Sequence, residues 1–146
     1  AAMQSRSNDT LRAKLVAALE ERSDILEAYL FGSRARGDAR VDSDYDVAGF
    51  FDPRAGQSFL ERSIDLAAAL APVVGSDSVD VVALNGAPPL LYHRVLSEGE
   101  LLVSRDLVAT TRRAGQAVSR YCDYVPHLAK IDYAHRLRIS AGAFGR

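Results

Sequence analysis

The sequence predicts an α/β (α+β) domain in which a small mixed sheet of about four strands is covered by helices. Three observations support this prediction. Apolar residues recur with helical spacing in several segments, shorter apolar runs of strand length lie between them, and glycine or proline stands at most of the junctions. The 146 residues are 48% hydrophobic and 25% charged, which suits one domain with a modest core.

The first elements are a helix and a strand. A helix is predicted over residues 9–22, where leucines recur every four residues and Asn8 or Asp9 can supply the N-cap. A strand rich in apolar and aromatic residues follows over 25–31 and is cut off by Gly32. The chain then passes through a turn or short helix that is bounded by two glycines.

A second strand and a capped helix come next. The strand is predicted over residues 45–51 and is ended by Pro53 and Gly56. Residues 58–61 have the S-x-x-E form of a capping box. This box opens a helix that Gly75 is placed to close.

The remaining elements alternate between strand and helix. They are a strand over 79–84, a helix that Pro88 and Pro89 begin and that reaches about Ser97, a short strand over 101–103 and a helix over 105–125. Pro126 is expected to kink or end the last helix. The domain therefore spans residues 9–126. For the extension over 127–146 the pattern does not decide between helix and coil, and its end is expected to fray.

The last predicted helix carries an apolar stripe. Its members recur with helical spacing and are Leu107, Thr111, Ala114, Val118, Tyr121 and Val125. The simplest interpretation is that this stripe is buried in the core. The alternative is that it forms the face on which a partner helix docks.

Composition and charge narrow the class of function. The net charge of −1 and the isoelectric point of about 6.3 argue against long nucleic acid as a partner. Cys122 is the single cysteine, so an internal disulfide is excluded, and we expect it to pack as a small residue in a cytoplasmic protein. No apolar run approaches the roughly 20 residues that span a membrane. The polar start of the chain shows no signal peptide.

Residues 32–46 carry the candidate chemistry. They comprise Gly-Ser, ten intervening residues, and an Asp-x-Asp motif at Asp44 and Asp46. Side chains two apart on a strand share a face, so these carboxylates would repel each other unless a cation lies between them. Mg²⁺ prefers carboxylate, water and phosphate oxygens. Asp80, a lone acid in the third predicted strand, is the best-placed third ligand of a two-metal site.

The glycine-bounded turn suits a phosphate. Gly32 permits a close approach of the backbone, and the free N–H groups of a helix start attract anions. The Ser33 hydroxyl can add a hydrogen bond to a triphosphate. Arg34 or Arg36 could hold the same phosphates through forked contacts, with a surface salt bridge as the alternative for either residue.

These parts together predict a phosphoryl-transfer site. One end would bind the β- and γ-phosphates, and the other would hold metal ions against the α-phosphate and the attacking hydroxyl. The simpler alternatives are a solvated acidic turn, since Asp38 and Asp42 lie near Asp44, and an exposed edge-strand acid at Asp80. His93 is expected to be a packing or surface residue rather than a base.

At these residues the chain resembles a known family. Gly-Ser-Arg-Ala-Arg-Gly at 32–37 and Ser-Asp-Tyr-Asp-Val at 43–47 resemble the signature of the DNA polymerase β-like nucleotidyltransferases. Within that superfamily the chain resembles the minimal nucleotidyltransferase (MNT) branch. The likeness continues through Asp80, residues 90–99 and residues 121–124, and so covers most of the chain.

The resemblance implies a function that the residues alone do not. Members of this branch are typically encoded beside a HEPN-domain ribonuclease toxin, and they act as its antitoxin by transferring AMP from ATP to a toxin tyrosine. For this chain it implies a polymerase β-like fold with a C-terminal helix, two Mg²⁺ ions, and a homo-oligomer or a hetero-oligomer with the toxin. It also implies that Ser33 binds the triphosphate and that Asp44 and Asp46 bind both metals. Asp80 would bind the catalytic metal and help to activate the acceptor hydroxyl.

Two other functions remain open from the sequence. One is an aminoglycoside-like nucleotidyltransferase that acts on a small molecule, although the C-terminal third of the chain is short for a drug pocket. The other is an antitoxin that neutralises a toxin by binding alone. The adjacent carboxylates of Asp44 and Asp46 favour catalysis, because a pure binder has no need of them.

Overall fold

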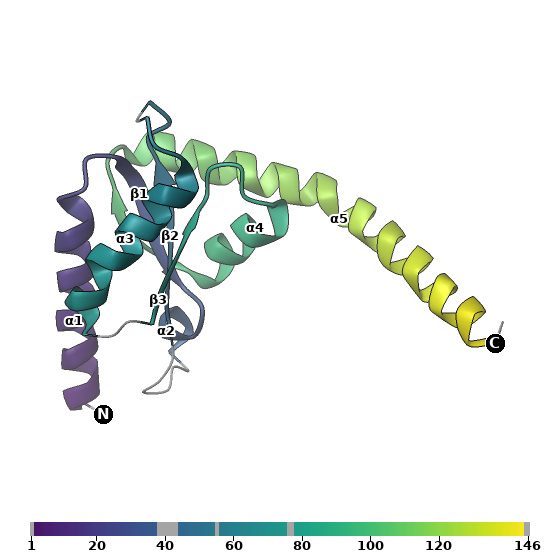
Figure 1. Ribbon diagram of the computed structural model, residues 1–146, viewed down its shortest axis with the longest axis horizontal. Coiled ribbons are helices and arrows are strands. Elements are labelled where there is room, and N and C mark those ends of the chain that lie inside the picture. Colours follow the sequence, from purple (N-terminus) through teal and green to yellow (C-terminus); the bar gives the residue numbers. More distant parts are fainter. Residues whose placement is uncertain (1, 38–43, 55, 76–77, 145–146) are drawn as a thin grey trace.

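The computed structural model describes residues 2–37, 44–54, 56–75 and 78–144 (Figure 1). The helices and strands follow in the order α1 (Ala2–Glu20), β1 (Ile25–Phe31), α2 (Ser33–Arg36), β2 (Tyr45–Phe51), α3 (Phe59–Val74), β3 (Val79–Ala83), α4 (Pro89–Glu98), β4 (Glu100–Ser104) and α5 (Leu107–Phe144). This order confirms the predicted one, and the glycine-bounded turn is the short helix α2. Asp38, Asp42 and Ser43 lie outside the described residues.

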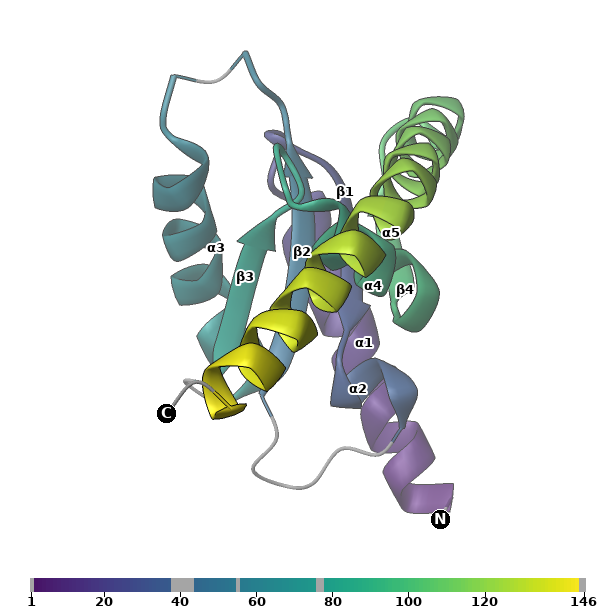
Figure 2. The same ribbon diagram turned by 90° about the vertical axis from the view of Figure 1, so that its right-hand side faces the viewer.

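The four strands form one mixed sheet in the order β3-β2-β1-β4 (Figures 1 and 2). The central strand β1 pairs antiparallel with β2 and with β4. The strand β3 pairs parallel with β2 and lies at an edge of the sheet. The predicted small mixed sheet of about four strands is therefore confirmed.

Apolar side chains fill both faces of the sheet. On one face α1 and α3 supply Leu15, Leu19, Leu66 and Leu70 to a core with alternate residues of the strands. On the other face α4 and α5 supply Tyr92, Val95 and Ala117, which pack with Tyr29, Phe31 and Ala48. Figure 1 shows α1 on the left of the sheet and α4 on its right. The second face, with α4 over it, is the one that carries the candidate site.

The predicted caps hold for α3 and fail for α1. Ser58 accepts a hydrogen bond from the backbone N–H of Glu61 at 3.1 Å, and Gly75 ends α3 in the left-handed conformation with φ of 69°. The helix α1, in contrast, begins at Ala2 and runs past Asn8 and Asp9 without a break. A potential N-cap residue is also tolerated inside a helix, so its presence did not fix the start.

The prediction for the face of α5 was wrong. Leu107, Val118 and Val125 are exposed, whereas Thr110 and Ala117 are buried. The helix also continues through Pro126, and its axis bends along its length (Figure 1). Its backbone is helical to Phe144, and the expected fraying of the chain end stays a prediction.

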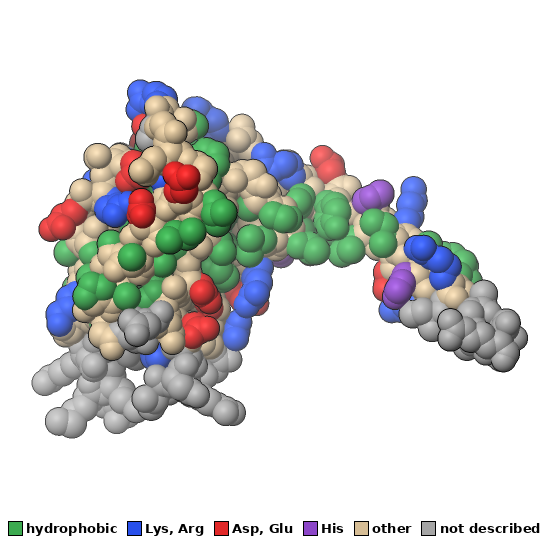
Figure 3. Space-filling view, viewed as in Figure 1, with side chains coloured by type: hydrophobic (Ala, Val, Ile, Leu, Met, Phe, Trp, Pro, Cys, Tyr) green, Lys and Arg blue, Asp and Glu red, His purple; other side chains and the backbone are tan. Residues whose placement is uncertain are grey.

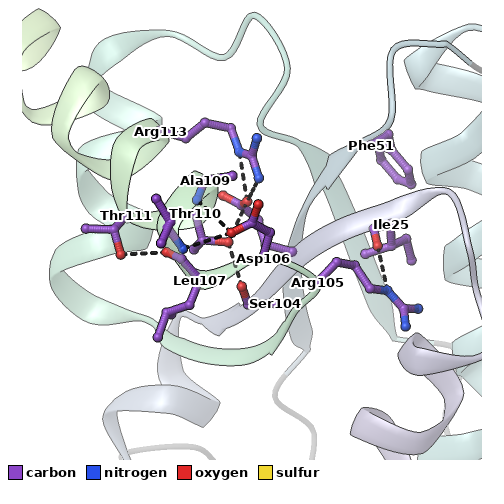
Figure 4. Close-up of polar contacts among 12 residues, drawn as sticks. Ile25, Phe51, Ser104, Arg105, Asp106, Leu107, Ala109, Thr110, Thr111 and Arg113 are labelled. Atoms are coloured by element: carbon purple, nitrogen blue, oxygen red, sulfur yellow. Dashed lines mark hydrogen bonds and ion pairs between the residues drawn. The ribbon is translucent and has the colours of Figure 1, made fainter.

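A buried polar cluster explains which face of α5 is turned inward (Figure 4). Glu27, on β1, is fully buried, and its Oε1 atom accepts hydrogen bonds from Thr110 Oγ1 at 2.9 Å and from Arg113 Nε at 2.8 Å. Ser104 in turn lies 2.7 Å from Thr110 Oγ1. A buried carboxylate requires such partners. Thr110 and Arg113 of α5 therefore face the sheet, and the leucine and valines of the predicted stripe face outward.

The start of this helix is also tied to the end of α1. Arg105 donates hydrogen bonds to the backbone carbonyls of Glu20, Arg22 and Ile25. Carbonyls at a helix C-terminus lack partners within the helix, and a guanidinium group can satisfy several of them at once. Within the described ranges, no helix combines the length and apolarity required to cross a membrane.

Candidate active site

The candidate site lies where β1 ends and where β2 and β3 begin. Asp46, on β2, is paired in register with Phe31 on β1 and with Asp80 on β3. Residues paired across neighbouring strands point to the same face of the sheet. Asp46 and Ala48 alternate with Tyr45 and Val47, so the acids share the face that α4 covers. The expected neighbourhood of Asp80 and the Asp-x-Asp motif is therefore observed.

Negative charge converges on Asp46. Its side chain is half-buried, whereas Asp44 and Asp80 are exposed. Burial raises the pKa of the Asp46 carboxyl above its usual value, and the charges of Asp80 and Asp44 raise it further. Arg94 and Arg36 oppose this shift. The charges of Asp44 and Asp80 thus both act on Asp46.

Gly32 has no room for a side chain. It adopts φ of 75°, in the region that favours glycine, and a Cβ atom there would lie 2.3 Å from Oδ2 of Asp46. The sequence suggested that the backbone at Gly32 lies close to a phosphate. In the structure this backbone also lies close to Asp46 of the Asp-x-Asp motif. The glycine-bounded turn and Asp46 are therefore packed against each other.

Replacing Gly32 by Ala is expected to displace Asp46 and to lower, on the order of a hundredfold, the rate of the phosphoryl transfer that the sequence predicts, because small misplacements of reacting groups are costly. A loss of roughly 1–2 kcal/mol in the free energy of unfolding should accompany it, from the positive φ. The matched control is Gly86→Ala, because Gly86 has φ of 70° but open space around its Cβ position. Similar destabilisation with unchanged turnover is expected for Gly86→Ala, and equal turnover losses in both variants would contradict the contact with Asp46.

The three polar residues that follow Gly32 have different surroundings. Ser33 is half-exposed and opens α2. The guanidinium carbon of Arg34 lies 4.3 Å from the ring centroid of Tyr45, a cation–π contact that holds α2 against β2. Arg36 forms an ion pair with Glu98 at 3.0 Å. The salt-bridge alternative is thus observed for Arg36, and it leaves the predicted phosphate contact as a proposal.

Sequence reasoning missed two residues of α4 beside the site. Arg94 lies with its guanidinium carbon 5.7 Å from the ring centroid of Phe31, the cross-strand partner of Asp46. Glu98 accepts hydrogen bonds from both Arg94 and Arg36. The available signal was the i, i+4 spacing of Arg94 and Glu98, but nothing in the sequence showed that this helix covers the site.

The acids suit a hard divalent cation. Within the described ranges, no three His, Cys, Asp or Glu side chains are already close enough together to enclose a metal ion. Three carboxylates that repel one another are expected to stand apart when no cation lies between them. The donor set of Asp44, Asp46 and Asp80 consists of oxygens alone, which fits Mg²⁺.

His93, His127 and Cys122 are not part of the proposed oxygen donor set. The ring of His93 stacks on that of Tyr121 with a centroid distance of 3.6 Å, which confirms the expected packing role. His127 packs at a tilt against Tyr124. Cys122 is exposed, so the expectation that it packs as a small residue was wrong.

Fold and site together define a nucleotide-transferring protein of the polymerase β class. The chain matches the family described as "Polymerase beta, Nucleotidyltransferase" over residues 13–107, and it belongs to this family. It is similar to the protein adenylyltransferase MntA of Aphanizomenon flos-aquae (strain 2012/KM1/D3), with 34% identity over 80 residues. That match covers 50% of this chain and 53% of the relative, so the chain spans about half the length of the curated relative.

Solved structures share the fold over nearly their whole length. A chain of a toxin–antitoxin crystal structure with AMP-PNP superimposes with a TM-score of 0.70 and 25% identity, covering 85% of this chain and 98% of that chain. A chain of a tri-AMPylated Shewanella oneidensis HEPN toxin in complex with its MNT antitoxin gives a TM-score of 0.67 and 23% identity, covering 88% and 98%. At that identity the second likeness concerns the fold alone. These matches confirm the polymerase β-like fold with a C-terminal helix.

Proposed function

We propose that this protein transfers AMP from ATP to a tyrosine hydroxyl of a partner HEPN toxin and thereby acts as its antitoxin. Family membership supports nucleotide transfer, and the similarity to a protein adenylyltransferase supports a protein as acceptor. The likeness to a toxin–antitoxin structure with AMP-PNP supports an adenine nucleotide and a toxin partner. ATP is an intracellular substrate, so we place the reaction in the cytoplasm.

The observation that carries the proposal is the pairing of Asp46 with Asp80 next to Asp44. Without a cation this arrangement is unfavourable, since each carboxylate makes the next harder to ionise. Repulsion of this kind on one face of a sheet is relieved when a cation binds, so it favours cation binding at this place. The close approach of Gly32 to Asp46 supports the proposal that the turn beginning at Gly32 binds the nucleotide beside the acids.

The residues divide the reaction between them. The backbone at Gly32 and the hydroxyl of Ser33 would hold the triphosphate, with Arg36 beside them. Asp44, Asp46 and Asp80 would hold two Mg²⁺ ions, which when bound neutralise charge on the α-phosphate and on the entering and leaving oxygens. Asp80, exposed on the edge strand, is open to an acceptor and would help to take the proton from its hydroxyl.

Atoms and charges balance in this step. The tyrosine oxygen forms a bond to the α-phosphorus, the bond to the β-phosphate bridging oxygen breaks, and pyrophosphate leaves. The product is an AMP–tyrosine phosphodiester. Little further chemistry is required of the protein, because positioning and charge neutralisation supply most of the acceleration.

The test is the intact mass of the partner HEPN protein after incubation with this protein, ATP and Mg²⁺. We expect the mass to rise by whole AMP units. An Asp44→Asn/Asp46→Asn double variant, incubated in parallel, should give no increase. A parallel reaction with EDTA in place of Mg²⁺ should also give none.

Two results would contradict the proposal in different ways. A stable complex that neutralises the toxin without any change in mass would indicate an antitoxin that acts by binding. A nucleotide adduct on an aminoglycoside, with none on the protein, would indicate a small-molecule transferase. An increase in mass that persists in the double variant would show that Asp44 and Asp46 are not the metal ligands.

A further inference from the structure

One carboxylate joins two arginines that are far apart in the sequence. Oε2 of Glu98 accepts a hydrogen bond from Arg36 NH1 at 3.0 Å and from Arg94 Nε at 3.3 Å. Arg36 ends α2, directly after the nucleotide-binding turn, whereas Arg94 lies on α4. Two cations on one anion leave a net positive charge at this place.

The last turn of α4 holds in place the backbone that carries this carboxylate. Gly99, which follows Glu98, donates its N–H to the carbonyl of Val95 at 2.8 Å. A Cβ atom at Gly99 would lie 2.2 Å from the same carbonyl and 3.1 Å from the carbonyl of Leu30. The end of the helix is therefore pressed against β1 at a position where a side chain does not fit. The backbone at Glu98 is consequently held beside β1, and the carboxylate itself is positioned by Arg36 and Arg94.

Arg94 is directed at the candidate site. Its guanidinium lies over Phe31, and Phe31 is the register partner of Asp46. The side chain of Arg94 is 52% exposed, and among the described residues it donates to Glu98 through Nε. The terminal nitrogens of Arg94 are thus available to a ligand at the site.

We propose that Arg94 is a second arginine that contacts the triphosphate, and that Glu98 is a positioning residue that orients Arg94 and Arg36 toward it. This inference rests on the proposed nucleotide transfer. A nucleoside triphosphate carries several negative charges, and the three carboxylates face it from one side. Cations are therefore required on the other side. Guanidinium groups match phosphate oxygens in geometry and charge, and prearranging two of them lowers the entropic cost of binding.

The test compares binding of ATP, ADP and AMP, each with Mg²⁺, by titration calorimetry of the full chain. Arg94→Met is expected to weaken ATP binding about tenfold, with less effect on ADP and least on AMP, because the lost contact is to the terminal phosphates. Arg94→Lys should retain part of the affinity as a point charge. Glu98→Gln, which keeps the shape but not the charge, should weaken ATP binding about threefold and should raise KM more than it lowers kcat.

The matched control is Arg12→Met. Arg12 forms an exposed ion pair with Glu100 at 2.6 Å, on the other face of the sheet, so its loss should leave ATP affinity unchanged. Thermal unfolding of every variant within a few degrees of the wild type would show that the fold is retained. ATP affinity that is unchanged in Arg94→Met, or an equal loss for ATP and AMP, would overturn the inference. Because binding is read without the partner, a failure of AMP transfer to the toxin would leave this result intact.

Discussion

Replacing Asp46 by Asn is expected to lower the rate of AMP transfer on the order of a thousandfold and, at the same time, to stabilise the fold. The loss of rate follows from the loss of a proposed metal ligand that is paired with Asp80 and lies two residues from Asp44. The gain in stability follows from the removal of a charge that burial and two neighbouring acids disfavour. Few substitutions have opposite effects on activity and stability, so this combination identifies a functional cluster.

The dependence of stability on pH follows from the direction of the pKa shift of Asp46. Because the pKa of Asp46 is raised in the folded protein, the ionised form destabilises the fold at neutral pH, and this penalty disappears as the pH falls through that pKa. Without divalent cations, the Tm of Asp46→Asn should therefore exceed that of the wild type at neutral pH, and the difference should shrink on acidification. Added Mg²⁺ should raise the Tm of the wild type more than that of the variant.

The control for this experiment is Asp65→Asn, since Asp65 is an exposed acid on α3. It should change neither the rate nor the response of Tm to Mg²⁺. A lower Tm for Asp46→Asn at neutral pH, without cations, would contradict the repulsion that we assign to the three carboxylates. A normal rate for that variant would remove Asp46 from the reaction.

Replacing Glu27 by Ala is expected to lower the free energy of unfolding by about 3–5 kcal/mol. Glu27 is 0% exposed, and its removal leaves the guanidinium of Arg113 and the hydroxyl of Thr110 without their buried partner. Arg113 also lies 4.6 Å from the ring centroid of Phe50, so its position depends on two contacts with the sheet. Urea unfolding with linear extrapolation measures the loss.

Two controls separate the charge from the lost volume. Glu100→Ala removes one partner of the exposed pair with Arg12 and should cost less than about 1 kcal/mol. The double variant Glu27→Leu/Arg113→Met removes both charges and should be clearly more stable than Glu27→Ala, because no unpaired charge remains. Equal effects of Glu27→Ala and Glu100→Ala would show that the buried cluster contributes no more than a surface pair.

The features that could be predicted from the sequence are those that depend on residues close together in the chain. Apolar periodicity and capping gave the element order, and α3 begins at the capping box and ends at the glycine that we expected. The spacing of Gly32, Asp44 and Asp46 indicated the site, and the single acid of β3 could be paired with it because residues of neighbouring strands share a face. These inferences required no knowledge of how the helices pack.

Tertiary packing decided the rest. The face of α5 that is turned to the sheet is set by Glu27, an acid within an apolar strand, and helical periodicity alone favoured the stripe of Leu107 and Val118 instead. Likewise, Arg94 and Glu98 have the spacing of an ordinary surface pair. They belong to the site only because α4 packs across the sheet beside Phe31.

The anchoring of α5 has a mechanical consequence. The helix is fixed to the sheet near its start through Thr110 and Arg113, whereas residues from 129 to 138 are exposed and apolar side chains such as Ile131 and Leu137 line its outer part (Figure 3). At 1.5 Å per residue, the part beyond Pro126 reaches about 27 Å. It is a lever, in which a rotation of about 5° at the bend moves the tip by about 2 Å. The direction in which α5 leaves the sheet is thus set by the hydrogen-bonded cluster of Glu27, Thr110 and Arg113. This cluster lies beneath the first turns of the helix, far from the part beyond Pro126.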